Sequence, residues 1–120
     1  MHSLKLLLFI PFFAILFLFT QCKTSQLPAD VPSCIKKMIR QIEKDSIRNP
    51  AASVWQYQYN GNTVYYIPPY CCDLMGQLFD SNCNLICNPD GGITGAGDGK
   101  CRDFISKRSN ERLIWKDSRK

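Results

Sequence analysis

Cysteine content is the feature that most constrains what this chain can fold into. Seven cysteines occur among 120 residues, and such a density is typical of small disulfide-linked domains exported to an oxidising compartment. A chain of this length forms at most one small domain, which excludes a large multidomain enzyme. The single histidine, His2, lies at the N-terminus, so the rest of the chain has no residue for a Ser-His or Cys-His pair. We therefore expect that the protein is not an enzyme.

Residues 1–21 have the form of a secretory signal peptide. Lys5 provides a basic start, residues 6–19 are apolar apart from Pro11, and polar residues close the segment. A membrane-spanning helix needs about 20 apolar residues, and no cluster of charges follows this shorter run. We therefore expect cleavage rather than a permanent membrane span.

Cys22 stands where bacterial lipoproteins carry the cysteine that receives a diacylglyceryl group and becomes the new N-terminus. Gln21 and Phe19 replace the small residue and the leucine that are usual at their positions, and ordinary cleavage after Thr20 or Cys22 is the alternative. With Cys22 set apart, six cysteines remain, and an even number can pair completely. We therefore expect lipidation of Cys22, and acyl chains such as palmitate would anchor the protein to a membrane.

The rest of the chain divides into a tether and one domain. Residues 22–30 form a short lipidated tether, and residues 31–120 form the domain. Asp30 or Ser33 can cap a helix at the start of the domain, and the helix ends before Pro50. Four apolar residues at helical spacing predict one buried stripe: Ile35, Met38, Ile39 and Ile42.

Asn60-Gly61 gives the strongest secondary-structure signal, a two-residue hairpin turn between strands 54–59 and 62–67. The turn pairs Tyr59 with Asn62 and fixes the register of both strands. One face is expected to be core and to pack against the helix: Trp55, Tyr57, Val64 and Tyr66. The opposite face is the better candidate for a binding platform: Gln56, Gln58 and Tyr65.

The second half of the domain is predicted to contain a second hairpin and a long loop. The hairpin covers residues 77–87, and residues 88–99 hold five of the seven glycines, which predicts a loop. A helical turn is expected at residues 102–108 and a last short strand at 113–115. The fold class is therefore α+β: a small disulfide-rich domain with one N-terminal helix packed on an antiparallel sheet of two hairpins, plus a Gly-rich loop.

The six remaining cysteines are expected to form three disulfides: Cys34, Cys71, Cys72, Cys83, Cys87 and Cys101. Fifteen pairings are possible. A bond between the adjacent Cys71 and Cys72 would be strained, so we expect each to reach a different partner. The alternative is a zinc site of four thiolates, but paired Cys-x-x-Cys motifs are absent from the sequence and export favours oxidation.

The Gly-rich segment fits neither common phosphate-binding motif. Cys101 follows Gly99-Lys100 where a P-loop needs Ser or Thr, and Lys100 stands where the dinucleotide motif needs its last glycine. Asp90 and Asp98 form a possible ligand site for calcium, which prefers oxygen ligands. A tight loop closed by the flanking cysteines is the favoured interpretation, and we expect no metal and no cofactor.

Charge is distributed unevenly along the chain. Residues 23–48 carry six basic and three acidic groups, residues 49–99 carry four aspartates and no basic group, and residues 100–120 carry eight basic and three acidic groups. The favoured interpretation is that the basic ends compensate the aspartates within the fold. The alternative is that they lie on anionic lipid headgroups. Nucleic acid is not an expected partner, because the chain is exported and has no continuous basic stretch.

Three motifs resemble a known family. These are Tyr-Tyr-x-Pro-Pro-x-Cys-Cys-Asp at residues 65–73, Cys-Asn-Leu-Ile-Cys at 83–87, and Asp-Gly-Gly-x-Thr-Gly-x-Gly-Asp-Gly-x-Cys at 90–101. They resemble a family of small uncharacterised lipoproteins from Bacteroidota-type bacteria, and the likeness extends over residues 34–117. The resemblance implies a cell-envelope location and one disulfide-linked α+β domain. It implies no activity, since the domain is one of unknown function.

The expected function is that of a lipid-anchored cell-envelope protein acting as a binding or structural module. Its expected partners are the membrane, through the lipid, and an envelope protein or glycan. The first alternative is an extracytoplasmic inhibitor or ligand-binding domain that uses the Gly-rich loop. A small metal-binding protein or enzyme is the second alternative.

Overall fold

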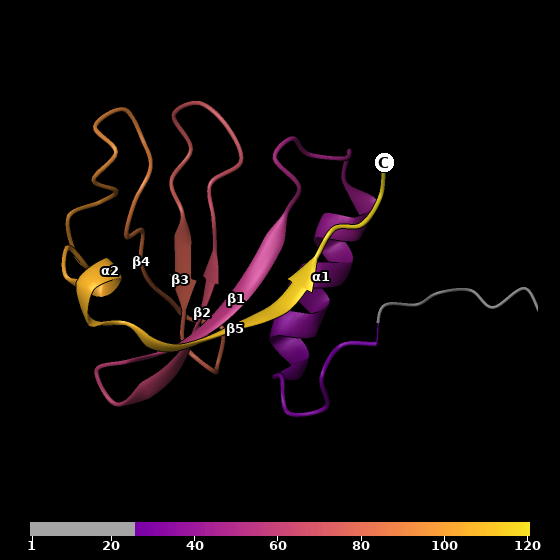
Figure 1. The fold of residues 1–120 in the computed structure, drawn as a ribbon, viewed down its shortest axis with the longest axis horizontal. Coiled ribbons are helices and arrows are strands. Elements are labelled where there is room, and N and C mark those ends of the chain that lie inside the picture. The colour runs from indigo at the N-terminus through magenta and orange to yellow at the C-terminus, as the bar shows by residue number, and fades with distance from the viewer. Residues whose placement is uncertain (1–25) are drawn as a thin grey trace, which may run out of the picture.

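The computed structural model describes residues 26–120, so the predicted signal peptide, Cys22 and the first part of the tether lie outside the described residues. The elements in chain order are α1 (Ser33–Lys44), β1 (Ser53–Tyr59), β2 (Asn62–Ile67), β3 (Gln77–Phe79), β4 (Leu85–Cys87), α2 (Phe104–Lys107) and β5 (Ser109–Lys116). The strands form one antiparallel sheet in the order β4-β3-β2-β1-β5 (Figure 1). No helix within residues 26–120 has the length and apolar character to cross a membrane.

The helix α1 forms where the apolar stripe predicts it. Ile35, Ile39 and Ile42 are buried, and the helix ends at Lys44, well before Pro50. The predicted caps are wrong: Pro32 precedes the helix, and no side chain caps its first turn. Asp30 pairs instead with Arg112 of β5, whose Nη1 lies 2.6 Å from the Asp30 carboxylate.

The β1–β2 hairpin has the predicted register. Tyr59 lies opposite Asn62, and Trp55 lies opposite Tyr66. Asn60 and Gly61 both have positive φ, 50° and 77°, which is the backbone of the two-residue turn whose twist matches that of the paired strands. The second hairpin, β3–β4, and the last strand, β5, also form, so the predicted helix on an antiparallel sheet is confirmed with five strands in the sheet.

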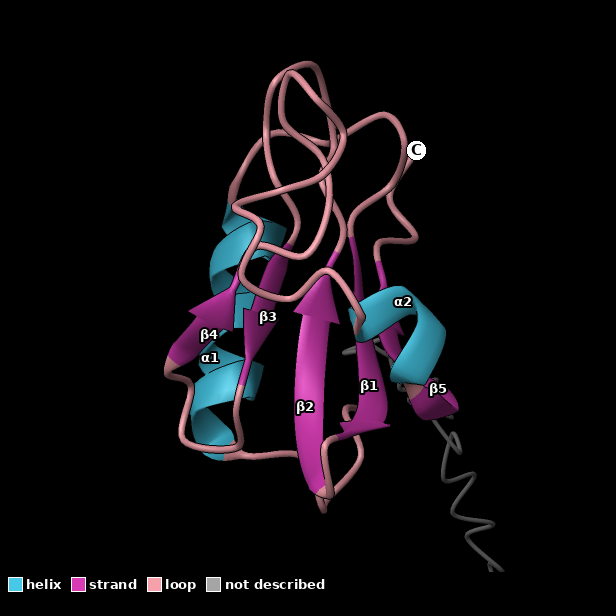
Figure 2. Cartoon of the chain, turned by 90° about the vertical axis from the view of Figure 1, so that its left-hand side faces the viewer, coloured by secondary structure: helices cyan, strands magenta, loops and turns pink. Residues whose placement is uncertain are grey.

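The prediction that α1 packs on the aromatic face is wrong. Tyr65, with only 2% of its surface exposed, lies on the face that α1 covers. Gln56 and Gln58 are half-buried, so the proposed platform is not an open surface. Both faces of the sheet are covered, as Figure 2 shows with α1 behind the strands and α2 in front. The reason lies in β2, whose last four residues are all buried. Such a continuous apolar run is typical of a strand covered on both sides.

The opposite face carries a second core built around Phe104 of α2, which is fully buried. Its ring lies 5.6 Å from that of Tyr57 and 5.3 Å from that of Tyr59, both nearly perpendicular. Such edge-to-face pairs are favoured by the ring quadrupoles. Tyr59 donates its hydroxyl hydrogen to Asp103 at 2.6 Å, so the aromatic rings are buried while their hydroxyls keep partners.

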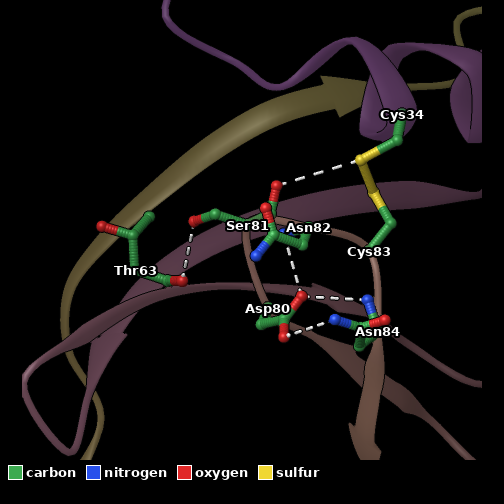
Figure 3. The surroundings of a disulfide bond; sticks show 7 residues. All are labelled: Cys34, Thr63, Asp80, Ser81, Asn82, Cys83 and Asn84. Carbon is green, nitrogen blue, oxygen red and sulfur yellow. Dashed lines mark hydrogen bonds between the residues drawn. A yellow bond between two sulfur atoms is a disulfide. The ribbon is translucent and has the colours of Figure 1, made fainter.

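Two disulfides fasten the outer elements to the sheet. Cys34–Cys83 joins α1 to the β3–β4 turn, and Cys87–Cys101 joins the end of β4 to the segment before α2. Figure 3 shows the first bond beside the turn that holds Cys83, in which Asp80 accepts hydrogen bonds from Asn84. Each layer is therefore covalently linked to the sheet that it covers.

Candidate functional site

The connection between β2 and β3, residues 68–76, is called the cysteine loop here. Pro68 and Pro69 end β2, because proline has no N–H to donate to the next strand. The chain then turns, with the Leu74 N–H donating to the Cys71 carbonyl oxygen at 3.1 Å. Cys72 takes a positive φ of 58° inside this turn, a region that residues other than glycine rarely adopt.

Backbone hydrogen bonds join the cysteine loop to residues 88–99, called the glycine loop here. The Gly92 N–H donates to the Leu74 carbonyl oxygen at 3.0 Å, and the Gly76 N–H donates to the Asp90 carbonyl oxygen at 3.0 Å. Gly76 has no room for a side chain, because a Cβ there would lie 2.1 Å from Oδ1 of Asp90. The two loops therefore form one unit at the end of the sheet.

Arg48 joins the other side of the cysteine loop to the segment that follows α1. Its guanidinium lies 4.1 Å from the centre of the Tyr70 ring, within the range of a cation–π contact, and it pairs with Asp45 at 3.3 Å. An open hollow of about 630 Å³ lies between this segment and the loop, lined by residues 44–49, Tyr70 and Cys71. Segments far apart in the sequence thus meet beside Cys71.

Apolar side chains are exposed on the three segments at this end of the domain, called the loop end here. In Figures 1 and 2 the connections after α1, β2 and β4 all project beyond the same end of the sheet. The exposed fractions are 51% for Ile47, 38% for Tyr70, 42% for Leu74, 41% for Met75 and 87% for Ile93. Scattered apolar residues are common on surfaces, whereas a gathered patch is typical of interaction sites.

Cys71 and Cys72 do not pair with the other cysteines, so the prediction of three disulfides is wrong. Both are exposed free thiols. The other four cysteines of the predicted set bond to one another in two pairs. The Cys72 thiol donates to the Cys71 sulfur at 2.7 Å. This hydrogen bond, then burial, then the charges of Cys72 and Asp73, raise the pKa of the Cys71 thiol.

The alternative of a zinc site is also wrong, because Cys83, Cys87 and Cys101 are oxidised in disulfides and provide no thiolate. Across residues 26–120, no three His, Cys, Asp or Glu side chains are grouped so as to hold a metal ion.

Asp90 and Asp98, the possible ligand pair, serve the fold in different places. The Asp98 carboxylate accepts the backbone N–H groups of Lys100 and Asn88, each at 2.9 Å, and these bonds lower its pKa. Asp90 accepts the hydroxyl hydrogen of Tyr66 through Oδ2, while its buried Oδ1 has no partner and faces Gly76. Burial, followed by this hydrogen bond, raises the pKa of Tyr66. Both aspartates therefore use their carboxylates to hold the glycine loop in place.

A second hollow, of about 540 Å³, lies at the opposite end of the sheet between the β1–β2 and β3–β4 turns. Its carboxylate, Asp80, already accepts the backbone N–H groups of Asn82 and Asn84, each at 2.9 Å, and the Asn84 side chain. These bonds lower the pKa of Asp80. Because its polar groups are occupied by the turn itself, we do not assign this hollow as the site.

Within residues 26–120, no ion pair joins the aspartates of the acidic middle to the basic ends, although the charge of Lys100 adds to the backbone hydrogen bonds that lower the pKa of Asp98. Asp80 and Asp98 accept backbone N–H groups, and Asp90 accepts a tyrosine hydroxyl. Ion pairs form instead within the basic segments and between them: Asp30–Arg112, Asp45–Arg48, Asp103–Lys107 and Asp117–Arg119.

One feature of the sequence does indicate the loop end. Cys71 and Cys72 follow Pro68-Pro69, which ends the strand, so both cysteines fall in a connection outside the sheet. Exposure of Leu74 and Met75, by contrast, depends on where the other loops lie, and no local pattern indicates it.

The chain matches, over residues 40–117, the family described as Domain of unknown function (DUF6970). The matched segment covers most of the chain, from the middle of α1 through β5, and includes both loops. No curated protein and no solved structure shows significant similarity to the chain. The chain belongs to the DUF6970 family.

Proposed function

We propose that this chain is a non-catalytic binding module of the bacterial cell envelope, lipid-anchored through Cys22, with the loop end as its contact surface. Disulfides persist in oxidising compartments outside the cytoplasm, and the domain contains two. The leader at residues 1–21 and the resemblance to Bacteroidota-type lipoproteins support export and anchoring.

The binding role rests on one observation: apolar side chains are exposed on loops that are held to one another. Five such residues, 38% to 87% exposed, lie on segments joined by hydrogen bonds and by the Arg48–Tyr70 contact. A preorganised surface of this kind loses little conformational entropy when a partner binds. The partner we propose is an envelope protein that presents apolar side chains. A glycan is less favoured, because Arg48 already covers one face of the Tyr70 ring.

The direction of α1 supports this assignment. The helix begins near the end of the sheet that carries the β1–β2 turn and runs toward the loop end (Figure 1). The chain therefore enters the domain far from the loop end, and an anchor at Cys22 leaves that end free to meet a partner.

Site-specific photo-crosslinking in the native envelope tests the contact surface. A crosslinking residue at Leu74 or Ile93 should yield a discrete adduct. The same residue at Asn62, which is exposed at the opposite end, is the matched control and should yield none. Equal adducts at all three positions, or none at any, would contradict the proposal.

Fractionation of a Cys22→Ala variant tests the anchor separately. The native protein should be found with the membranes, and the variant should be released into the soluble extracytoplasmic fraction. Membrane association that survives the substitution would show that the lipid is not the anchor, whatever the loop end binds.

A protease inhibitor is the second candidate function, and one residue favours it. Ile93 is 87% exposed at the surface of the glycine loop, which Cys87–Cys101 closes at its base. An exposed residue on a cross-linked loop can occupy a protease pocket. Inhibition of at least one extracytoplasmic protease, lost in Ile93→Asp, would support this role, and no inhibition across a broad panel would exclude it.

A further inference from the structure

The adjacent thiols of Cys71 and Cys72 have no part in the fold or in the proposed binding role. The four bonded cysteines are in or near the core, with Cys87 1% and Cys101 6% exposed, whereas Cys71 and Cys72 are both exposed. Thiol reactivity requires access by the reacting partner as well as a thiolate. Among the cysteines of residues 26–120, only Cys71 and Cys72 are both free and exposed, so they meet the first requirement.

The two sulfur atoms are already in close contact. They are 2.7 Å apart, closer than two sulfur atoms come without a bond and not far above the roughly 2.05 Å of a disulfide. Both thiols therefore meet within the turn that the Leu74 N–H and the Cys71 carbonyl oxygen close. Little movement separates this arrangement from a covalent bond between them.

Strain makes such a bond reversible rather than structural. Neighbouring Cα atoms across a trans peptide are about 3.8 Å apart, less than the roughly 4.4–6.8 Å usual in disulfides, and Cys72 already has a positive φ of 58°. Disulfides outside the usual geometry are more easily reduced. The two structural bonds, by contrast, have Cα separations of 6.2 and 6.1 Å.

We propose that Cys71 and Cys72 form a redox site that exchanges with disulfides of the extracytoplasmic space and closes to a vicinal disulfide. One thiolate attacks a protein or small-molecule disulfide, forming a mixed disulfide and releasing the first thiol. The neighbouring thiolate then attacks the loop sulfur of that bond and releases the second thiol. Two protons leave the pair, and two electrons pass to the exchanging disulfide, which is reduced to two thiols.

Equilibration of the full-length protein in glutathione buffers, followed by alkylation and intact-mass measurement, tests the site. In reducing glutathione the protein should accept two labels on Cys71 and Cys72, with Cys22 lipidated. In oxidised glutathione both labels should be lost together, and the mass should fall by two hydrogens. Digestion should then yield one peptide in which Cys71 is bonded to Cys72. A trivalent arsenical, which needs two neighbouring thiols, should bind one to one in the reduced form only.

Cys71→Ser and Cys72→Ser are the matched controls, because both positions are exposed and neither change removes core packing. Each variant should stop at the mixed disulfide with one glutathione attached, and each should lose the arsenical. Two labels that persist in oxidised glutathione would overturn the proposal. So would two glutathiones on the native protein, or a bond from either cysteine to Cys34, Cys83, Cys87 or Cys101.

Discussion

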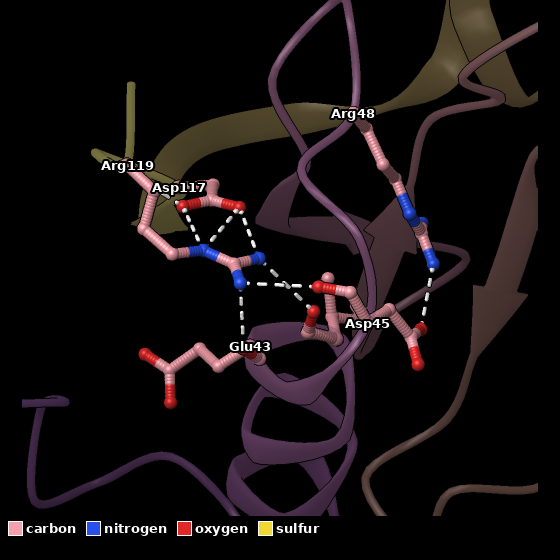
Figure 4. Close-up of polar contacts among 6 residues, drawn as sticks. Glu43, Asp45, Arg48, Asp117 and Arg119 are labelled. Atoms are coloured by element: carbon pink, nitrogen blue, oxygen red, sulfur yellow. Dashed lines mark hydrogen bonds and ion pairs between the residues drawn. The ribbon is translucent and has the colours of Figure 1, made fainter.

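Asp117 and Arg119 fasten the C-terminal end of the chain to the last turn of α1. The Asp117 side chain is 3% exposed and accepts hydrogen bonds from Arg119, with Nη2 at 2.7 Å. The same guanidinium donates to the carbonyl oxygens of Glu43 at 2.7 Å, Asp45 at 3.1 Å and Ile42 at 3.3 Å (Figure 4). These carbonyls lie at the C-terminal end of α1, where a cation also matches the helix dipole.

Removal of the Asp117 charge should destabilise the domain. Asp117→Asn keeps the shape of the side chain but weakens the contact that orients Arg119 toward α1. Loss of hydrogen bonds at a buried acceptor costs about 1–3 kcal/mol, so the free energy of unfolding measured in urea should fall by that amount. Asp45→Asn removes the side-chain charge that pairs with Arg48 but keeps the backbone carbonyl that Arg119 meets. It is the control and should lower the free energy of unfolding less. Equal effects would contradict the assigned role.

The Asp117 contribution should also depend on pH. Its hydrogen bonds with Arg119 lower its pKa, although burial opposes them. A carboxyl with a lowered pKa in the fold stabilises the protein above its unfolded pKa of about 3.9. This contribution is lost as the pH falls through the folded value. The difference in unfolding free energy between the native protein and Asp117→Asn should therefore be complete at pH 6 and shrink below about pH 4. A difference that is the same at pH 6 and pH 3 would show that charge is not its cause.

The two structural disulfides should stabilise the fold by different amounts. Cys34–Cys83 closes a separation of 49 residues and Cys87–Cys101 one of 14. Chain entropy then predicts about 4 kcal/mol for the first and about 3 kcal/mol for the second. Paired Cys→Ala variants should lower the free energy of unfolding in that order, measured with Cys71 and Cys72 replaced by Ser throughout. The reverse order would show that core packing of Cys87 and Cys101 outweighs loop entropy.

The hairpin and α1 could be predicted because their signals are local. Asn60-Gly61 fixes a turn and hence a register, and the stripe of isoleucines fixes one face of a helix. The sequence does not determine which face of the sheet α1 covers, because β2 carries buried residues on both of its faces. The prediction takes the face with more aromatic residues as the core. Val54 and Ile67, however, make the opposite face apolar as well, and they pack on the α1 side.

The candidate site could be predicted only in part, because cysteine parity does not determine pairing. Six cysteines allow three bonds, but they do not require them. Cys71 and Cys72 lie where β2 has ended and the chain projects beyond the sheet, while Cys34, Cys83, Cys87 and Cys101 lie on elements that pack on it. Distance from the core, which no spacing in the sequence encodes, separates the reactive cysteines from the structural ones.

The contact between the cysteine loop and the glycine loop should fail when Gly76 gains a side chain. In Gly76→Ala the new Cβ would lie 2.1 Å from Asp90 Oδ1 and 2.8 Å from Cε2 of Tyr66, so one of these groups must move. Overpacking of this kind costs roughly 1–3 kcal/mol, and amide hydrogens of Gly76 and Gly92, both bonded across the loops, should exchange faster.

A double-mutant cycle with Asp90→Ala separates this clash from a general effect of the substitution. Asp90→Ala removes the carboxylate oxygen that meets the new Cβ, and it also removes the acceptor of the Tyr66 hydroxyl. If the clash with Oδ1 is the cause, Gly76→Ala should cost less in the Asp90→Ala background than in the native protein, because sites in direct contact are not additive. Costs that add fully would place the strain at Tyr66 instead and leave Asp90 without a role in joining the loops.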